Sequence, residues 1–206
     1  RVKFQNTRNH LTAYSPGLRF EDLTEAGLSN YAIHLREVKY LQNSTIIKQI
    51  KLLKWFLRWA TVKGYCQTLD YINFKPKLKT TEKKIVFLDW AELMTIYNYP
   101  FTDKQKTLER VRDVFCFCCF TSLRYSDVAN LKRSDVFDGH ISLTTIKTAD
   151  SIKIELNKYS RAILDKYADQ QYPGNRALPV ISNQKMNDYL KEMGKICGID
   201  QPITIT

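Results

Sequence analysis

The chain has 206 residues, of which 44% are hydrophobic and 26% charged, as is typical of a globular protein with one large or two small domains. No apolar run is long enough to span a bilayer and Arg1 begins no signal-peptide pattern, so we expect a cytoplasmic protein with no membrane partner. The net charge of +11 is concentrated near the start: residues 1–84 carry 16 Lys and Arg against 6 Asp and Glu, and residues 85–206 carry 16 against 15. So basic a segment predicts a polyanionic partner, of which nucleic acid is the usual one.

The five cysteines predict neither disulfides nor a metal site. Their number is odd, and Cys116, Cys118 and Cys119 crowd one predicted helix, where they cannot form a regular disulfide framework. No second cysteine pair or nearby histidine completes a zinc site. We therefore interpret these cysteines as small buried hydrophobic side chains.

The basic first part of the chain predicts three helices. The first lies within residues 1–19 and ends before the Pro16-Gly17 break, and the second runs from Phe20 to about Arg36. Acidic residues in the first turn favour the start of the second helix because they complement the helix dipole.

The third predicted helix begins at the capping residues Asn43-Ser44-Thr45 and ends at Gly64. Its apolar side consists of Ile46, Ile50, Leu53, Phe56, Leu57 and Ala60, and its basic residues are Lys48, Lys51, Lys54 and Arg58, with Trp55 among them. Such a basic stripe is either a solvated face opposite a core or a DNA-binding face, and the charge of the region favours DNA. Trp55 either lies along a sugar–phosphate backbone or packs on a neighbouring helix.

Residues 74–84 are polar, basic and interrupted by Pro76, which is typical of a linker between domains. We therefore predict a helical DNA-binding domain over residues 1–73, a basic linker over 74–84 and a second domain over 85–206.

The second domain begins with residues 85–88, which predict a short strand or an extended segment. Asp89 caps a helix that ends before Pro100, and a further helix starts at Asp103. The part of that helix from Val111 to Phe120 is apolar almost all round, so we expect it to be buried.

After Leu131 the apolar residues alternate, which predicts a β-hairpin with its turn at residues 147–151 and Lys147 at the edge of that turn. The alternating residues are Ile141, Leu143, Ile146, Ile152, Ile154 and Leu156. Two more helices are predicted, over about 158–168 and 184–197.

Arg124 follows the buried helix directly and begins another short helix, within the sequence TSLRYSDVANL. Leu123, Val128 and Leu131 are the residues expected to anchor that short helix to the core. A guanidinium held in this way keeps its charge near neutral pH, and its fork of donors suits the oxygens of a phosphodiester. The alternative is a surface arginine paired with Asp127, which lies three residues later on the same helical face.

This succession of features resembles the tyrosine recombinases, the phage-integrase family, and in type the integrases of bacterial mobile elements. The sequence TSLRYSDVANL is similar to the box around the family's first catalytic arginine, with Ser122 where glycine is common, and Thr145-Ile-Lys-Thr148 is similar to its hairpin lysine. The resemblance implies a mainly α fold with a small β component. A helical, SAM-like core-binding domain would be followed by part of an α+β catalytic domain with a β-hairpin.

The resemblance also implies a function. The protein would be a site-specific recombinase that binds double-stranded DNA, exchanges strands through a 3′-phosphotyrosyl intermediate without metal or other cofactor, and forms a tetramer on DNA when full length. Arg124 would bind the scissile phosphate, Lys147 would protonate the departing 5′ oxygen, and Asp127 would hold the arginine in place. Without that context, Lys147 is an ordinary turn lysine.

The sequence departs from the family pattern after Lys147. It contains no H-x-x-R box, and none of its tyrosines, Tyr125 and Tyr189 included, lies in the context expected of the nucleophile. The resemblance therefore implies a truncated recombinase that is inactive alone, with these groups beyond Thr206. Two alternatives stay open: a DNA-binding regulator that kept the fold and lost the chemistry, and an unrelated helical nucleic-acid-binding protein.

Overall fold

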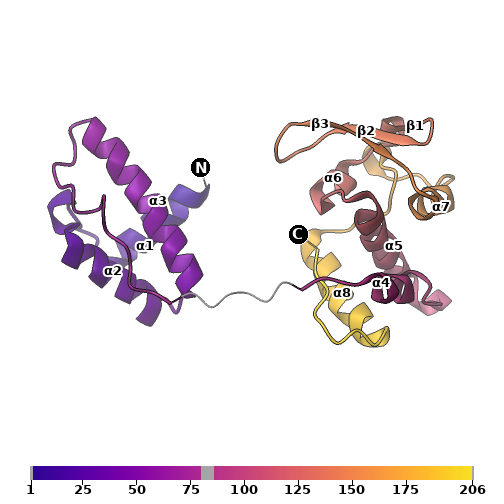
Figure 1. Ribbon diagram of the computed structural model, residues 1–206, viewed down its shortest axis with the longest axis horizontal. Helices are drawn as coiled ribbons and strands as arrows, with labels where there is room; N and C mark the ends of the chain where they lie inside the picture. The colour runs from indigo at the N-terminus through magenta and orange to yellow at the C-terminus, as the bar shows by residue number, and fades with distance from the viewer. Residues whose placement is uncertain (1, 80–85, 206) are drawn as a thin grey trace. The chain divides into compact units, whose positions relative to one another are not determined.

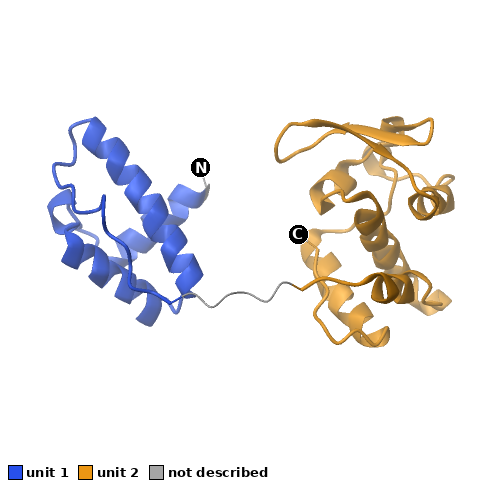
Figure 2. Cartoon of the chain, viewed as in Figure 1, with its two compact units in different colours: residues 1–84 blue, residues 85–206 orange. Residues whose placement is uncertain are grey.

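The structure is a computed structural model that describes residues 2–79 and 86–205, and the chain divides into two compact units, residues 1–84 and 85–206 (Figure 2). Unit 1 is built from helices, and unit 2 combines helices with a small antiparallel sheet (Figure 1). The predicted fold class, mainly α with a small β component, is therefore confirmed.

Unit 1 contains α1 (Val2–Tyr14), the 3-10 turn η1 (Phe20–Asp22), α2 (Glu25–Glu37) and α3 (Asn43–Val62). The prediction that one helix runs on from Phe20 is wrong, because η1 ends at Asp22 and α2 starts afresh behind its own cap. That cap is Thr24, whose hydroxyl accepts a hydrogen bond from the backbone N–H of Gly27.

The core of unit 1 lies between α2 and α3. Its fully buried side chains include Leu28, Tyr31 and Leu35 from α2 and Ile46, Ile50, Leu53 and Leu57 from α3. The apolar side predicted for α3 is confirmed except at Phe56, which remains 37% exposed. Its ring lies at the flank of the helix and stacks on Phe20 and Trp59, with centroids 6.2 and 5.7 Å away.

Part of the segment predicted as a linker lies on unit 1. Phe74 is buried in the core of that unit, Leu78 packs against the same core, and Asn43 Nδ2 donates a hydrogen bond to the Lys79 carbonyl at 2.7 Å. Two apolar anchors in a basic, proline-containing segment are enough to attach it, and composition alone does not reveal them. Residues 80–84 lie outside the described part of the chain.

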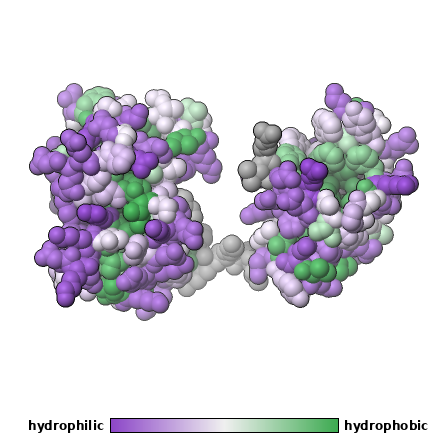
Figure 3. Space-filling view, turned by 180° about the vertical axis from the view of Figure 1, so that it is seen from behind, coloured by the Kyte–Doolittle hydropathy of each residue, from purple (hydrophilic) through white to green (hydrophobic). Residues whose placement is uncertain are grey.

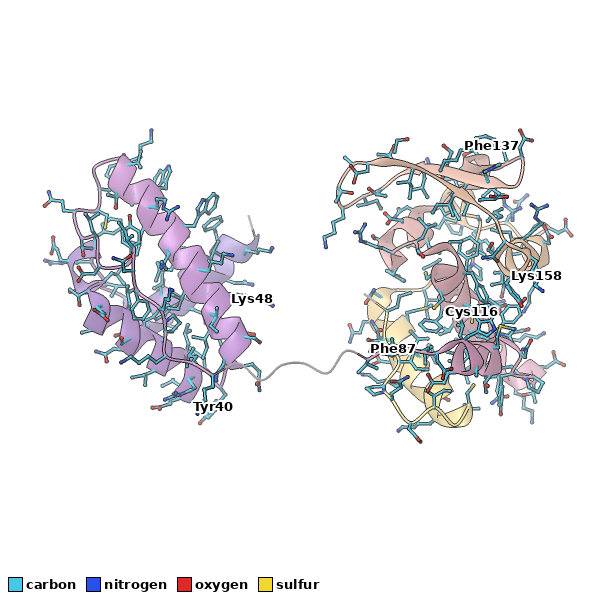
Figure 4. All side chains as sticks on the ribbon, in the orientation of Figure 1. Tyr40, Lys48, Phe87, Cys116, Phe137 and Lys158 are labelled. Carbon is cyan, nitrogen blue, oxygen red and sulfur yellow. The ribbon has the colours of Figure 1, made fainter. Side chains whose placement is uncertain are left out.

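Unit 2 is built around α5 (Lys106–Thr121), which contacts the other major helices of the unit (Figure 1). These are α4 (Trp90–Tyr97), α6 (Tyr125–Asn130), α7 (Lys158–Lys166) and α8 (Asn183–Ile196), with 3-10 turns at Asp103–Gln105, Arg133–Asp135 and Pro173–Asn175. The predicted burial of α5 is confirmed, and its residue Cys116, labelled in Figure 4, is fully buried. Cys118 is also buried, but Cys119 is exposed and does not fit the expected burial of all three cysteines.

The sheet contains the predicted hairpin and one strand that the sequence did not indicate. Strands β2 (His140–Thr144) and β3 (Ser151–Glu155) pair antiparallel, with Ile141 opposite Ile154 and Leu143 opposite Ile152. The added strand, β1 (Val136–Phe137), has two residues, too few to give an alternating pattern. Residues 86–88, predicted as a strand or extended entry, form no strand, and Ile85 lies outside the described residues.

A buried carboxylate attaches α7 to α5. Asp113 is 2% exposed, and its two oxygens accept hydrogen bonds from Arg112 Nε at 2.8 Å, Lys166 Nζ at 2.7 Å and the Tyr167 hydroxyl at 2.7 Å. Burial, with the adjacent Asp113 carboxylate, raises the pKa of Tyr167. Because both oxygens have partners, the buried charge is compensated and fixes the spacing of the two helices.

Candidate functional site

Arg124 lies at the junction between the central helix and α6. Its backbone is extended, with φ −69° and ψ 153°, and its carbonyl accepts the first hydrogen bonds of α6, from Asp127 N and Val128 N. Leu123, Val128 and Leu131 are buried as predicted, so the backbone on both sides of Arg124 is fixed. The side chain is exposed, and within residues 2–79 and 86–205 no hydrogen bond or ion pair engages its guanidinium.

The backbone conformation of Ser122, two residues before Arg124, is one that glycine adopts more easily than serine. Ser122 ends α5 in the left-handed conformation, with φ 58° and ψ 15°. Any residue with a Cβ is strained there, whereas glycine adopts the conformation freely. The turn that brings the chain from α5 to Arg124 therefore forms with serine at some cost in stability.

Asp127 does not contact Arg124 in the way that the sequence suggested. It is 3% exposed, and its Oδ1 accepts a hydrogen bond from the backbone N–H of Ile146 at 2.9 Å. No ion pair forms between Arg124 and Asp127 among the described residues. The carboxylate therefore connects α6 to the turn of the hairpin.

Lys147 lies in that turn, next to Ile146. The turn spans residues 145–150 and is closed by Thr145 N donating to the Asp150 carbonyl at 2.9 Å and Ala149 N donating to the Thr145 carbonyl at 3.0 Å. Lys147 is exposed, and no partner for its ammonium appears in the described part of the chain. The structure thus places both predicted catalytic cations on the surface of unit 2, on two segments that Asp127 joins.

Tyr125, the residue after Arg124, is held by the protein. Its hydroxyl donates a hydrogen bond to the Ile181 carbonyl, and burial raises its pKa, an effect that nearby Arg176 opposes. A phenol with a raised pKa that is already bonded to a carbonyl is a poor nucleophile. The Tyr125 hydroxyl is therefore already engaged by the protein.

In unit 1, the predicted basic stripe is an exposed face of α3. Lys48, Lys51, Trp55 and Arg58 follow one another at helical spacing and are exposed, and Figure 4 shows Lys48 projecting from the helix. The ring of Trp55 packs on Phe4 of the neighbouring helix α1, with centroids 5.1 Å apart, and stays 62% exposed.

Lys54 differs from the other basic residues of α3. Its ammonium donates hydrogen bonds to the carbonyls of Ile72 and Phe74, at 3.0 and 2.9 Å, so it holds the following segment against the helix. Burial, together with nearby Arg58 and Lys75, lowers its pKa. The segment brings Lys75 into a cleft of about 430 Å³ beside Lys51, Trp55 and Arg58, a placement that no local sequence pattern signalled.

The described residues contain no group of three or more His, Cys, Asp or Glu side chains that could hold a metal ion. Within the same residues, no helix has the length and apolar character needed to cross a membrane. The space-filling view shows polar side chains over much of the visible face of both units, with smaller apolar areas among them (Figure 3).

The fold and part of the sequence match known proteins. Residues 2–76 match the family model of the phage integrase SAM-like domain. A lambda integrase dimer bound to a COC′ core site has 16% identity and a TM-score of 0.77, with 98% of this chain and 73% of that chain covered. The chain therefore has the fold of this DNA-bound integrase. The residues that match the SAM-like domain model lie in unit 1.

Two further structures share the recombinase fold. A lambda integrase tetramer bound to a Holliday junction has 18% identity and a TM-score of 0.74, with 98% of this chain and 60% of that chain covered. The Tn1549 transposon integrase in complex with transposon right end DNA has 15% identity and a TM-score of 0.71, with coverages of 94% and 72%. No curated protein matches the sequence.

Proposed function

We propose that this chain supplies the DNA-binding unit and part of the catalytic centre of a site-specific recombinase, which exchanges strands of double-stranded DNA through a 3′-phosphotyrosyl intermediate. The observation that supports it most is the state of Arg124: a fixed backbone, an exposed guanidinium and no protein partner within the described residues, on a fold shared with DNA-bound integrases. An arginine whose role was to stabilise this fold would be expected to bond to the protein, as Arg112 does.

Arg124 is suited to bind the two non-bridging oxygens of the scissile phosphate. These oxygens gain negative charge as the phosphorus becomes pentacoordinate, and a guanidinium already in position stabilises that charge without reorganisation. Lys147 supplies the other requirement, a proton for the departing 5′ oxygen. In the step, the tyrosine oxygen bonds to phosphorus as the P–O5′ bond breaks, the tyrosine loses its proton and the 5′ oxygen gains one.

We assign the nucleophile to no tyrosine of this chain. Tyr125 bonds to the Ile181 carbonyl and Tyr167 to buried Asp113, so neither hydroxyl is available. By resemblance, the nucleophilic tyrosine and the H-x-x-R box belong to a part of the protein outside residues 1–206. Covalent catalysis of this kind retains the energy of the phosphodiester bond in the intermediate, so the exchange needs no ATP.

The exposed face of α3 is the proposed contact of unit 1 with the DNA backbone. Lys48, Lys51 and Arg58 supply cations that are not used within the described structure, and Lys75 extends the same surface. The flat ring of Trp55 can lie along the sugars between phosphates. On this basis the chain binds duplex DNA largely independently of sequence through unit 1, and we propose assembly into a tetramer on DNA for the complete protein.

The test uses the complete protein and a duplex carrying its recombination site. Arg124→Ala and Lys147→Ala should bind this DNA as the wild type does and lose strand cleavage, because both act on the transition state rather than on docking. Lys153→Ala is the control, since Lys153 is an exposed lysine on β3 of the same hairpin and should leave cleavage unchanged. Normal recombination by either variant of a catalytic cation would refute the role given to that residue.

A further inference from the structure

The hydrogen bond from Ile146 N to Asp127 Oδ1 is unusual because its two ends lie in different kinds of structure. Asp127 is in the first turn of α6, three residues after Arg124, and is 3% exposed. Ile146 directly precedes Lys147 in a surface turn, and its own side chain is 57% exposed. One hydrogen bond of 2.9 Å therefore links the segment that carries Arg124 to the segment that carries Lys147.

The hairpin turn does not satisfy this N–H by itself. Its backbone bonds run between Thr145 and Asp150 and from Ala149 to Thr145, and the Thr145 and Thr148 hydroxyls bond to each other at 2.8 Å. These bonds close the base of the turn, where Thr145 is 6% exposed. Residues 146–150 are exposed, and the hydrogen bond from Ile146 N to Asp127 attaches this outer part of the turn to the rest of unit 2.

A carboxylate is a demanding group to place in this position. Burying a carboxylate costs several kcal/mol unless hydrogen bonds compensate. Asp127 offsets this cost through a hydrogen bond that a small apolar residue cannot form. A charged acceptor also forms a stronger hydrogen bond to a backbone N–H than a neutral one does. The chemistry of Asp127 therefore fits the task of fixing an exposed backbone segment.

We propose that Asp127 is a positioning residue for Lys147, and that it sets the placement of the hairpin turn relative to Arg124. The proposal rests on the proposed function for its catalytic meaning. Val128 and Leu131 anchor α6 in the core, so Asp127 and the Arg124 backbone form one rigid piece. The ammonium of a lysine sits on a flexible stem, and the backbone must be fixed before that stem reaches one oxygen reproducibly, since small misplacements lower rates steeply.

The structural part of this proposal can be tested on the chain itself. Amide hydrogen exchange at Ile146, followed by NMR, should become faster by about tenfold or more in Asp127→Ala, because the exposed turn then offers that N–H no acceptor. Asp127→Asn should stay closer to the wild type, because its amide oxygen still accepts. Asp150→Ala is the matched control, since it removes from the same turn a carboxylate that forms no hydrogen bond or ion pair within residues 2–79 and 86–205.

Exchange at Ile141 and Ile154, in the paired strands of the hairpin, reports whether the fold survives each substitution. Unchanged exchange at Ile146 in a folded Asp127→Ala variant would overturn the proposal. Faster exchange at Ile146 together with both strand amides would show a general loss of structure and would also overturn it. Amide exchange at Ile146 in Asp127→Asn then tests the same hydrogen bond without removing the side chain.

The catalytic part requires the complete protein and two DNA substrates, one with the natural 5′ oxygen and one with sulfur in its place at the scissile phosphate. A thiolate leaves without a proton, so a defect in proton donation disappears with the sulfur substrate. Lys147→Ala and Asp127→Ala should both be slow with oxygen, by about tenfold or more for Asp127→Ala, and both should recover with sulfur. Arg124→Ala should be slow with both substrates.

The outcomes separate the two proposals. If Lys147→Ala cleaves the oxygen substrate normally, the general-acid role in the proposed function fails, while the exchange result at Ile146 still decides whether Asp127 places the turn. If Lys147→Ala recovers with sulfur and Asp127→Ala does not, Asp127 acts on something other than Lys147 and the inference is wrong. Recovery of both variants supports it.

Discussion

Replacing Lys48, Lys51 and Arg58 by glutamine tests whether α3 binds the DNA backbone. The three side chains are exposed on one face and have no recorded partner in the described structure, so their charges are available to phosphates. Each phosphate contact contributes about 0.9 to the slope of log affinity against log salt concentration, so losing three contacts should reduce the slope by about 2.7. At about 0.1 M salt the same relation predicts a loss of affinity of roughly 500-fold.

The assay measures binding of the chain to a fluorescent duplex of arbitrary sequence at several salt concentrations, because backbone contacts do not depend on sequence. The control replaces Lys104, Lys191 and Lys195 by glutamine, which removes the same charge from exposed positions outside the proposed contacts. An unchanged slope in the α3 variant would show that this face is only solvated. An equal reduction in the control would show that net charge, rather than this surface, governs binding.

Three further predictions concern unit 2 and the chain as given. Ser122→Gly should stabilise the protein by about 1 kcal/mol in urea denaturation because it relieves the left-handed conformation, whereas Ser126→Gly inside α6 should destabilise it slightly. Asp113→Ala should cost about 3 kcal/mol because it leaves buried cationic and hydroxyl donors without their acceptor, whereas Glu109→Ala, at a more exposed pair, should cost less than about 1 kcal/mol. Incubated with a nicked substrate, the chain should bind DNA but form no adduct that survives denaturing electrophoresis, and an adduct would refute the assignment of the nucleophile elsewhere.

The helices and strands that the sequence predicted well are those whose buried side chains recur at regular spacing along the chain. The apolar spacing along α3 and the all-round apolar stretch of α5 identify both helices, since each side chain's neighbours are set by the helix itself. The hairpin follows from alternation, and its register brings Ile141 opposite Ile154 as alternation requires. Family resemblance added Arg124 and Lys147, which spacing alone left open between catalytic and ordinary surface roles.

The missed features depend on contacts between distant segments. Asp127 lies three residues from Arg124, so helical spacing suggested an ion pair, but its recorded partner is Ile146, 19 residues away. Nothing within α6 reveals this, because the contact exists only when the hairpin turn is packed against the helix. Lys54 was grouped with its basic neighbours for a similar reason, since its bonds to Ile72 and Phe74 depend on how the chain returns along α3.

Asp127 and Lys54 share one physical feature that a count of charges does not reveal. Lys54 and Asp127 are charged side chains that form hydrogen bonds to the protein backbone. In such side chains, hydrogen bonds to the protein replace hydrogen bonds to water, and the charge stabilises the structure. Arg124, Lys147 and Lys51 keep their hydration and have no recorded partner in the described residues, so a phosphate is free to replace water around them. Substituting Lys54 or Asp127 should therefore shift the backbone segment that each holds. Substituting Arg124, Lys147 or Lys51 should remove a proposed contact with DNA and leave the fold intact. On that basis the excess of cations in unit 1 exceeds the number of DNA contacts that we propose for it, and the proposed interface is the exposed subset whose number the salt slope would report.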